Sequence, residues 1–262
     1  MQTHTFVVSA IFRRNSIFFK WYGWRWRRAL KAFETLFVQN AESKELLAEL
    51  GFHNVVVAGD TRFDRVIDIQ NEAKHLPLCE TFAQGRQVLV AGSSWAPDED
   101  ILIDYFNRHD GWRLILAPHV VSDEHLREME GKLRRPAVRY TQASADNVAQ
   151  AECLIIDCYG LLSSIYRYAK VAYVGGGFGV GIHNTLEAAV YGMPVVFGPK
   201  WQKFREARGL LEVGAAVSVK NYREMAKALD SAFANQQQMG KAATDYVNGE
   251  LGATEKIYSE VF

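Results

Sequence analysis

Short apolar runs alternate with helical segments along most of this 262-residue chain, and this alternation restricts its fold more than any other feature. The runs lack a polar–apolar alternation, which is typical of parallel strands buried between two layers of helices. The sequence predicts strands at residues 5–12, 36–39, 55–58, 88–91, 112–117, 137–140, 153–156, 171–174 and 194–197. It predicts helices at residues 16–34, 40–51, 98–108, 122–133, 160–168, 184–191, 204–212 and 222–234. Strands and helices that follow one another through short loops indicate an α/β fold with open parallel sheets.

The alternation is interrupted once, at residues 67–86. This segment shows little periodicity and contains Pro77 and Gly85, which favours a linker or a segment that crosses between domains. Residues 87–262 are long enough for a complete doubly wound domain, whereas residues 1–66 supply only about three strands. We therefore expect one complete Rossmann-like domain and a partial second α/β domain, with the last helices able to cross back to the latter.

The net charge of zero conceals an uneven distribution of charge. Residues 13–31 contain seven basic side chains and no acidic one, which leaves 23 basic against 30 acidic residues in the rest of the chain. Three of the six tryptophans lie in the same part of the sequence. We call residues 12–33 the basic aromatic segment.

A cationic segment rich in tryptophan is typical of proteins that contact an anionic membrane surface. Two other interpretations stay open, namely stacking on single-stranded nucleic acid and an amphipathic helix whose apolar stripe packs into its own domain. We expect that stripe to comprise Tyr22, Trp26, Leu30 and Phe33. The residues left for membrane or acceptor contact are Trp21, Trp24, Arg25, Arg27 and Arg28.

Other compositional features exclude several classes of protein. No apolar run reaches the roughly 18 to 20 residues that cross a bilayer. The three cysteines, Cys79, Cys153 and Cys158, form neither a disulfide framework nor a CxxC metal motif. We therefore expect a reducing compartment and no bound metal.

The strongest local signal is a loop with five glycines between Gly175 and Gly181, which follows a predicted strand and precedes a predicted helix. Glycine backbone before a helix N-terminus is typical of an anion site, most often for phosphate. The spacing does not give the G-x-G-x-x-G pattern, and no acidic residue ends the following strand. The loop therefore predicts a phosphate site and argues against a nicotinamide dinucleotide.

Glu187 lies in the first turn predicted after this loop. Its carboxylate could accept hydrogen bonds from two ribose hydroxyls of a nucleotide. Residues Asn184 to Glu187 also fit a capping box, in which the glutamate only binds a backbone N–H. The residues alone leave both interpretations open.

Five segments, taken in order, resemble motifs of one family. Residues 57–64 resemble its Gly-x-x-Lys-Phe-Asp, residues 90–94 its Ala-Gly-Ser-Thr, residues 114–119 its Ala-Pro-Arg-His, residues 157–162 its Asp-x-x-Gly-Glu-Leu, and residues 175–189 its glycine loop with His-Asn-x-Leu-Glu-Ala-Ala. The family is that of the 3-deoxy-D-manno-octulosonic acid (Kdo) transferases, which are glycosyltransferases of the two-Rossmann-domain (GT-B) type. The resemblance covers essentially the whole chain.

The resemblance implies an inverting glycosyltransferase that moves Kdo from CMP-Kdo to the lipid A precursor lipid IVA in lipopolysaccharide biosynthesis. It implies no cofactor, no metal and no nucleic acid partner, and a place at the cytoplasmic face of the bacterial inner membrane. Two alternatives stay open: another nucleotide-sugar glycosyltransferase or a UDP-sugar epimerase of the same fold, and a non-catalytic module that binds nucleotides or RNA.

The family pattern, carried over to this sequence, assigns candidate residues. Arg62 stands where a basic residue stabilises the transition state, although the residues alone favour a salt bridge with Asp60 or Asp64. The CMP and donor candidates are Gly92, Ser93, Pro118, His119, Gly160, Leu161, Leu162, Gly176, Gly177, Asn184, Thr185, Leu186 and Glu187.

Three of these candidates depart from the family pattern. His119 replaces an arginine, which makes a phosphate contact weaker or pH-dependent, and it is equally plausible as a structural histidine. Leu161 replaces an acidic residue, and Arg62 replaces a lysine.

The resemblance also places a membrane anchor, the acceptor surface and a glutamate base ahead of residue 1. Residues 1–66 would then be the C-terminal part of the acceptor-binding domain, residues 67–86 a linker, and residues 87–262 the CMP-Kdo-binding domain. We therefore expect a fragment that binds CMP or CTP weakly and has no transferase activity by itself.

Overall fold

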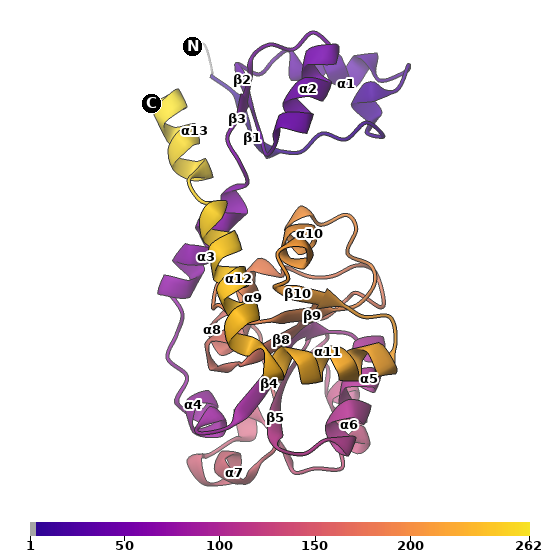
Figure 1. Cartoon of the computed structure of the whole chain (residues 1–262), viewed down its shortest axis with the longest axis vertical. Helices are drawn as coiled ribbons and strands as arrows, with labels where there is room; N and C mark the ends of the chain where they lie inside the picture. The colour runs from indigo at the N-terminus through magenta and orange to yellow at the C-terminus, as the bar shows by residue number, and fades with distance from the viewer. Residues whose placement is uncertain (1–3) are drawn as a thin grey trace. The chain divides into compact units, whose positions relative to one another are not determined.

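A computed structural model describes residues 4–262, so the first three residues of the expected first domain lie outside the described part. The chain divides into two units. The first comprises Met1–Arg65 together with Asn248–Phe262, and the second comprises Val66–Val247. Each unit has its own parallel sheet, as Figure 1 shows.

The first unit is built on three parallel strands in the order β1-β2-β3. These are β1 (Phe6–Ala10), β2 (Thr35–Val38) and β3 (Val55–Val57). The apolar strands supply a small core with α2 (Ala41–Glu49), which Asn40 caps as predicted by accepting from the Ser43 N–H. The alternation of strand and helix predicted from the sequence is confirmed here.

The predicted continuous helix at residues 16–34 is wrong. The structure has a short 3-10 helix η1 (Ile17–Phe19) and a separate α1 (Trp24–Leu30), joined through a tight turn at Gly23. A Cβ at Gly23 would lie 2.1 Å from the carbonyl oxygen of Ile17, so the chain closes there too tightly for a larger residue. The helical spacing of the aromatic residues did not reveal this break.

The end of the chain belongs to the first unit through α13 (Ala253–Val261). The carboxylate of Asp64, in α3 (Thr61–Asn71), accepts from the backbone N–H groups of Gly252 at 2.8 Å and Thr254 at 2.7 Å. Partial burial alone would raise the pKa of Asp64, but these backbone hydrogen bonds hold it below its usual value. Asp64 therefore caps the last helix and is not the partner of Arg62.

The second unit has seven parallel strands in the order β10-β9-β8-β4-β5-β7-β6. They are β4 (Gln87–Ser94), β5 (Trp112–Pro118), β6 (Ala137–Arg139), β7 (Cys153–Ile155), β8 (Val171–Val174), β9 (Val195–Phe197) and β10 (Ala216–Ser218). The chain builds outward from β4 on one side and then returns to place β8 on its other side. The order therefore reverses between β4 and β8, which is where open α/β sheets bind ligands.

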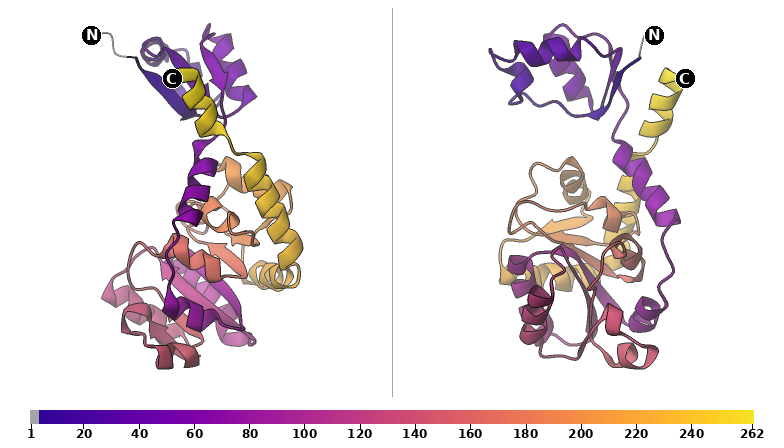
Figure 2. Two further views of the ribbon diagram at one scale, coloured as in Figure 1. Left: turned by 90° about the vertical axis from the view of Figure 1, so that its left-hand side faces the viewer. Right: turned by 180° about the vertical axis from the view of Figure 1, so that it is seen from behind.

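Helices cover both faces of this sheet (Figure 2). Apolar side chains of α5 (Ala96–Arg108), α6 (Asp123–Lys132) and α11 (Tyr222–Ala234) form one core with alternate strand residues such as Leu89 and Leu114. The remaining helices of this unit are α4 (Pro77–Ala83), α7 (Ala145–Gln150), α8 (Leu162–Ile165), η2 (Tyr140–Gln142), η3 (Tyr166–Tyr168), α9 (Leu186–Ala189), α10 (Arg205–Glu212) and α12 (Gln236–Gly249). The predicted complete doubly wound sheet is confirmed.

Several boundaries differ from the sequence predictions. The segment at residues 67–86, expected to be a linker or a domain-crossing segment, holds the end of α3 and all of α4, and the division between the units falls within α3. The predicted helix at 184–191 shrinks to the four residues of α9. Helix α7 and strand β10 were missed, although Ser144 and Asn147 form a capping box that the sequence could have revealed.

Two glycines hold the end of β8 against the end of β9. A Cβ at Gly177 would lie 2.6 Å from the Cα of Gly198, and a Cβ at Gly198 would lie 2.6 Å from the carbonyl carbon of Gly177. Because both neighbours are backbone, neither can move aside without displacing a strand.

We predict that Gly177→Ala lowers the free energy of unfolding by about 2 kcal/mol or more, because the added methyl group overlaps backbone atoms. Urea denaturation followed by circular dichroism checks this value. Gly131→Ala, in α6 with open space around the new methyl group, is the matched control and should be neutral or stabilising by about 0.5–1 kcal/mol. Equal stability of the two variants would contradict the proposed close approach.

Candidate functional site

The reversal of strand order places three loops side by side at the carboxyl edge of the large sheet. They follow β4, β5 and β8, whose strands are hydrogen-bonded neighbours. Most of the predicted donor-binding residues lie on these loops or at the ends of the strands that they follow. The structure thus brings together residues that are up to about 95 positions apart in the sequence.

The end of β4 is held under strain. Ser93 has a φ of 52°, in the left-handed region that side chains rarely adopt. Buried Ser94 donates from its hydroxyl to Glu99 Oε1 at 2.9 Å, and Glu99 Oε2 lies 2.9 Å from His125 Nε2. A Cβ at Gly92 would lie 2.1 Å from the Tyr166 hydroxyl, so glycine is required there for packing.

The N–H groups of the glycine loop are largely used within the protein. Gly175 donates to the Gly92 carbonyl, Gly179 and Gly181 donate to the Gly176 carbonyl, and Gly176 donates to Asp98 Oδ2 at 2.9 Å. The glycines therefore serve close backbone packing, as at Gly177. The sequence signal found the loop correctly, but these four N–H groups are not directed at a ligand.

Asn184 and Glu187 form a polar pair at the start of α9. The Asn184 side chain accepts from the Leu186 N–H at 3.1 Å and donates from Nδ2 to Glu187 Oε1 at 3.1 Å. Burial raises the pKa of Glu187, and the hydrogen bond from Asn184 opposes part of this effect. The bond described for the Glu187 carboxylate joins it to a side chain, not to the backbone N–H that a capping box requires.

Thr185 is completely buried next to this pair. Its hydroxyl oxygen has no hydrogen-bond partner among residues 4–262. Leu186, in contrast, packs as an apolar core residue. A buried hydroxyl without a partner costs free energy, which is typical of functional sites.

At the end of β5, Pro118 is buried and His119 is exposed. The His119 ring stacks on the ring of Trp95, with centroids 4.5 Å apart, and on that of His183, with centroids 4.7 Å apart. Trp95 and His183 were not among the predicted site residues. Their positions directly after the Ala-Gly-Ser-Ser motif and directly before Asn184 were the available signals.

The last predicted donor segment lies before and within α8. Gly160 is exposed with a φ of 83°, and Leu161 precedes the helix. The Leu162 Cδ1 atom would lie 2.8 Å from a Cβ at Gly92, so this segment packs directly against β4. Both leucines are half-buried and contribute apolar surface at this edge.

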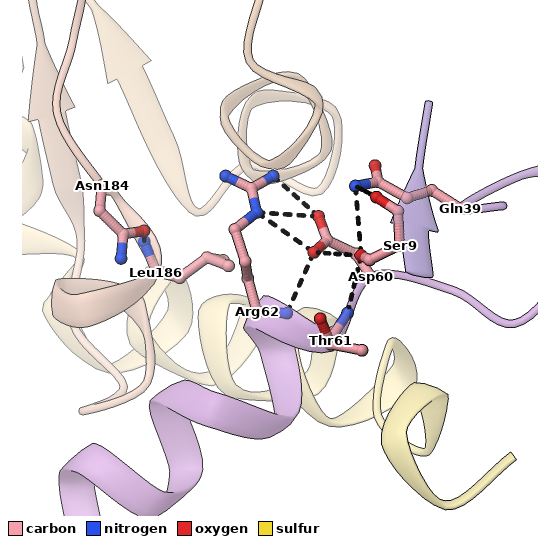
Figure 3. A network of polar contacts seen from close by, with 7 residues as sticks. All are labelled: Ser9, Gln39, Asp60, Thr61, Arg62, Asn184 and Leu186. Atoms are coloured by element: carbon pink, nitrogen blue, oxygen red, sulfur yellow. Dashed lines mark hydrogen bonds and ion pairs between the residues drawn. The ribbon is translucent and has the colours of Figure 1, made fainter. Parts of the chain in front are cut away.

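In the first unit, Arg62 takes part in a polar network at the ends of the three strands (Figure 3). Its Nε and Nη2 atoms donate to the two carboxylate oxygens of buried Asp60, at 3.1 and 2.7 Å. Ser9, whose φ is 54°, donates from its hydroxyl to Asp60 and accepts from the Thr61 N–H. Gln39 donates to the Ser9 carbonyl at 3.0 Å. The salt bridge expected with Asp60 is present.

The basic aromatic segment is more exposed than expected. Trp21 is 89% exposed and Trp24 54%, and Arg25 lies over the Trp24 ring at 5.2 Å. Tyr22 and Trp26 are 46% and 45% exposed, so the expectation that they pack into the domain is wrong. Of that predicted stripe, Leu30 is buried and Phe33 packs against the core.

Arg27 has a structural role within the basic aromatic segment. Its Nη1 donates to the carbonyl oxygens of Phe18 at 2.9 Å and Lys20 at 3.2 Å, which joins η1 to α1. Arg28 is exposed and makes no such bond among the contacts described. The two arginines are therefore not equivalent candidates for a contact with another molecule.

Within residues 4–262, no group of three or more histidine, cysteine or carboxylate side chains is arranged to hold a metal ion. The helices of this described part are also too short or too polar to cross a membrane.

Comparisons with known proteins agree with the motifs. Residues 1–65 match the family model described as 3-deoxy-D-manno-octulosonic-acid transferase (kdotransferase). The curated 3-deoxy-D-manno-octulosonic acid transferase of Aquifex aeolicus (strain VF5) is 28% identical over 205 residues, which cover 76% of this chain and 54% of that protein. The enzyme of the same name from Bordetella pertussis is 27% identical over 270 residues, covering 95% of this chain and 61% of the relative. The chain thus spans about half the length of the curated relatives it matches.

Solved structures show the same fold. The C-terminal CMP-Kdo binding domain of WaaA from Acinetobacter baumannii is matched over 71% of this chain and 97% of that domain, with a TM-score of 0.57 and 20% identity. A UDP-N-acetylglucosamine 2-epimerase is matched over 98% of this chain and 64% of its own, with a TM-score of 0.62 and 13% identity. The resemblance read from the five motifs is confirmed: the chain is similar to the Kdo transferases, and its fold is that of a GT-B glycosyltransferase with one complete Rossmann-like unit and a partial second α/β unit.

Proposed function

We propose that this chain is the donor-binding part of a glycosyltransferase that moves Kdo from CMP-Kdo to a lipid A precursor. The observation that carries the proposal is the Asn184–Glu187 pair at the reversal of strand order, beside the unpartnered Thr185 hydroxyl. A carboxylate kept partly buried at this edge is suited to two neighbouring ribose hydroxyls. The named Kdo transferases, similar over three quarters of the chain or more, supply the substrate class.

In the transfer, a base removes the proton of an acceptor sugar hydroxyl, whose oxygen then attacks the anomeric carbon of Kdo. The bond from that carbon to the CMP phosphate oxygen breaks, and CMP leaves with one more negative charge. The residues assigned here act on CMP: Glu187 and Asn184 on the ribose, and His119 on the phosphate. We nominate none of these residues as the base.

Arg62 stays a prediction for a cation that offsets the charge on the leaving phosphate. The bidentate contact with Asp60 fixes the direction of its guanidinium group. A fixed cation costs less reorganisation during the reaction than a mobile one.

The acceptor and the location are part of the same proposal. The acceptor is lipid IVA, and the protein acts at the cytoplasmic face of the bacterial inner membrane. The exposed tryptophans and the arginines of the basic aromatic segment support contact with an anionic membrane surface, because they join apolar rings to positive charge.

We predict that isothermal titration calorimetry detects binding of CMP, weaker binding of UMP and no binding of an oligonucleotide. Glu187→Gln should weaken CMP binding about tenfold or more, because a charged acceptor for two hydroxyls is lost. Glu212→Gln, an exposed substitution on α10, is the control and should leave the affinity unchanged. A preference for UMP would favour another nucleotide-sugar enzyme, and preferred binding of the oligonucleotide would favour an RNA-contacting module.

We also predict that Glu187→Gln stabilises the unliganded protein at pH 8. Because burial raises the pKa of Glu187, its favourable contribution is complete at low pH and is lost as the pH rises through the folded-state value. The variant has no charge to bury, so its advantage in the free energy of unfolding should be near zero at pH 4 and grow toward pH 8. Urea denaturation at several pH values tests this trend, and Glu212→Gln should show none. A destabilised variant at every pH would indicate a capping role instead.

For the membrane contact, we predict that Trp24→Ala combined with Arg28→Glu reduces co-sedimentation with anionic liposomes several-fold. Arg28 is preferred to Arg27, whose loss would break two backbone contacts. Arg223→Glu, at an exposed position of α11, changes the net charge equally and should have little effect. Equal losses in both proteins would show that only net charge matters.

A further inference from the structure

Three aromatic rings stack at the carboxyl edge of the large sheet, each from a different loop. His119 lies against both Trp95, at 4.5 Å, and His183, at 4.7 Å between ring centroids. The planes of Trp95 and His183 are inclined by only 12°. Two histidines in direct contact make this stack a place where a proton can be bound or released.

A single hydrogen bond determines which of the two histidines stays neutral. The indole nitrogen of Trp95 lies 3.0 Å from His183 Nε2, and an indole nitrogen can only donate. His183 must therefore present an unprotonated Nε2 and carry its proton on Nδ1. If His183 were protonated at Nε2, its N–H would face the indole N–H of Trp95, and this hydrogen bond would break.

The surroundings of His183 act in the same direction. Burial is the largest cause that lowers the pKa of His183, the neighbouring His119 lowers it further, and the carboxylate of Asp98 opposes them only in part. The Asp98 carboxylate is already shared among the N–H of Trp95, the N–H of Gly176 and the hydroxyl of Tyr173.

His119 is under no such restriction. It is exposed, and no hydrogen bond to its ring is made by residues 4–262, where only its backbone N–H donates to Ser94. Two polar side chains near these loops are engaged within the protein, since Lys200 Nζ donates to the Gly179 carbonyl and the Tyr159 hydroxyl accepts from the Val121 N–H. His119 is thus the member of the stack that can become charged.

We propose that the binding of the CMP phosphate is coupled to the uptake of one proton by His119, and that Trp95 is a positioning residue that keeps His183 neutral. This inference rests on the proposed function, since it assumes that the donor phosphate lies at His119. The proton comes from water or buffer and binds an imidazole nitrogen, and no covalent bond of CMP changes. Keeping His183 neutral avoids two stacked cations, so the full charge of His119 faces the phosphate.

The coupling has a definite sign. Above pH 7 a phosphate monoester is a dianion, because its second pKa is about 6. The bound dianion favours the charged imidazole, so protons are taken up. The affinity for CMP must then fall as the pH rises from 7 to 8.5, by up to about tenfold per pH unit.

Calorimetry of CMP binding to the full chain at pH 7.5, in Hepes and in Tris, measures the number of protons exchanged. We expect an uptake of about 0.5 to 1 proton per CMP bound. His119→Arg should bind CMP with no uptake, because its guanidinium is always charged. His53→Gln, at an exposed position in the first unit, is the control and should retain the full uptake.

The role of Trp95 needs a separate readout, which is the imidazole 15N spectrum. In the unaltered chain His183 should remain the neutral Nδ1–H tautomer when CMP binds, and in Trp95→Phe it should begin to titrate together with His119. CMP binding without proton uptake, uptake that persists in His119→Arg, or protonation of His183 in the unaltered chain would overturn the inference and leave nucleotide binding intact. Absence of CMP binding would overturn the proposed function and this inference with it.

Discussion

The carboxylate of Asp98 is the interaction on which the large sheet's ligand edge depends. It is completely buried and accepts from the N–H of Trp95, from the N–H of Gly176 and from the hydroxyl of Tyr173. These three donors belong to the loop after β4, the glycine loop and β8. A buried carboxylate is tolerated only when such bonds compensate for the lost hydration. These hydrogen bonds offset the cost of burying the carboxylate. They also fix two loops that are far apart in the sequence relative to each other.

The smaller sheet uses the same physical solution. Buried Asp60 follows β3 and binds Arg62, the N–H of Arg62 and the hydroxyl of Ser9. In both sheets a strained serine, Ser9 or Ser93, lies at the end of a strand beside this arrangement. A strained backbone and a buried charge persist only where the surrounding contacts fix the conformation. Such residues are common at functional sites.

The alternation of apolar runs predicted both parallel sheets, because burial on two faces leaves a clear pattern in the sequence. It did not predict the break at Gly23 or helix α4, since these depend on a steric closure and on tertiary packing that no periodicity reports. The glycine loop was found by composition, yet its role in backbone packing at Gly177 and Gly198 follows only from the register of two strands. Trp95 was missed for a similar reason, because its ring acquires meaning only when the sheet places His119 and His183 against it.

The use of the loop's own N–H groups determines how a phosphate would have to be held. In many nucleotide sites the glycine backbone supplies the positive field. Here Gly175, Gly176, Gly179 and Gly181 donate to protein acceptors, and α9 has only four residues and thus a small dipole. Charge on the phosphate must then be balanced by side chains at the same edge. His119 is an exposed candidate there, and the charge of a histidine, unlike that of an arginine, depends on pH. Because most of the glycines in this loop use their N–H groups within the protein, the positive charge opposite the phosphate has to come from a side chain such as His119, which belongs to the ring stack.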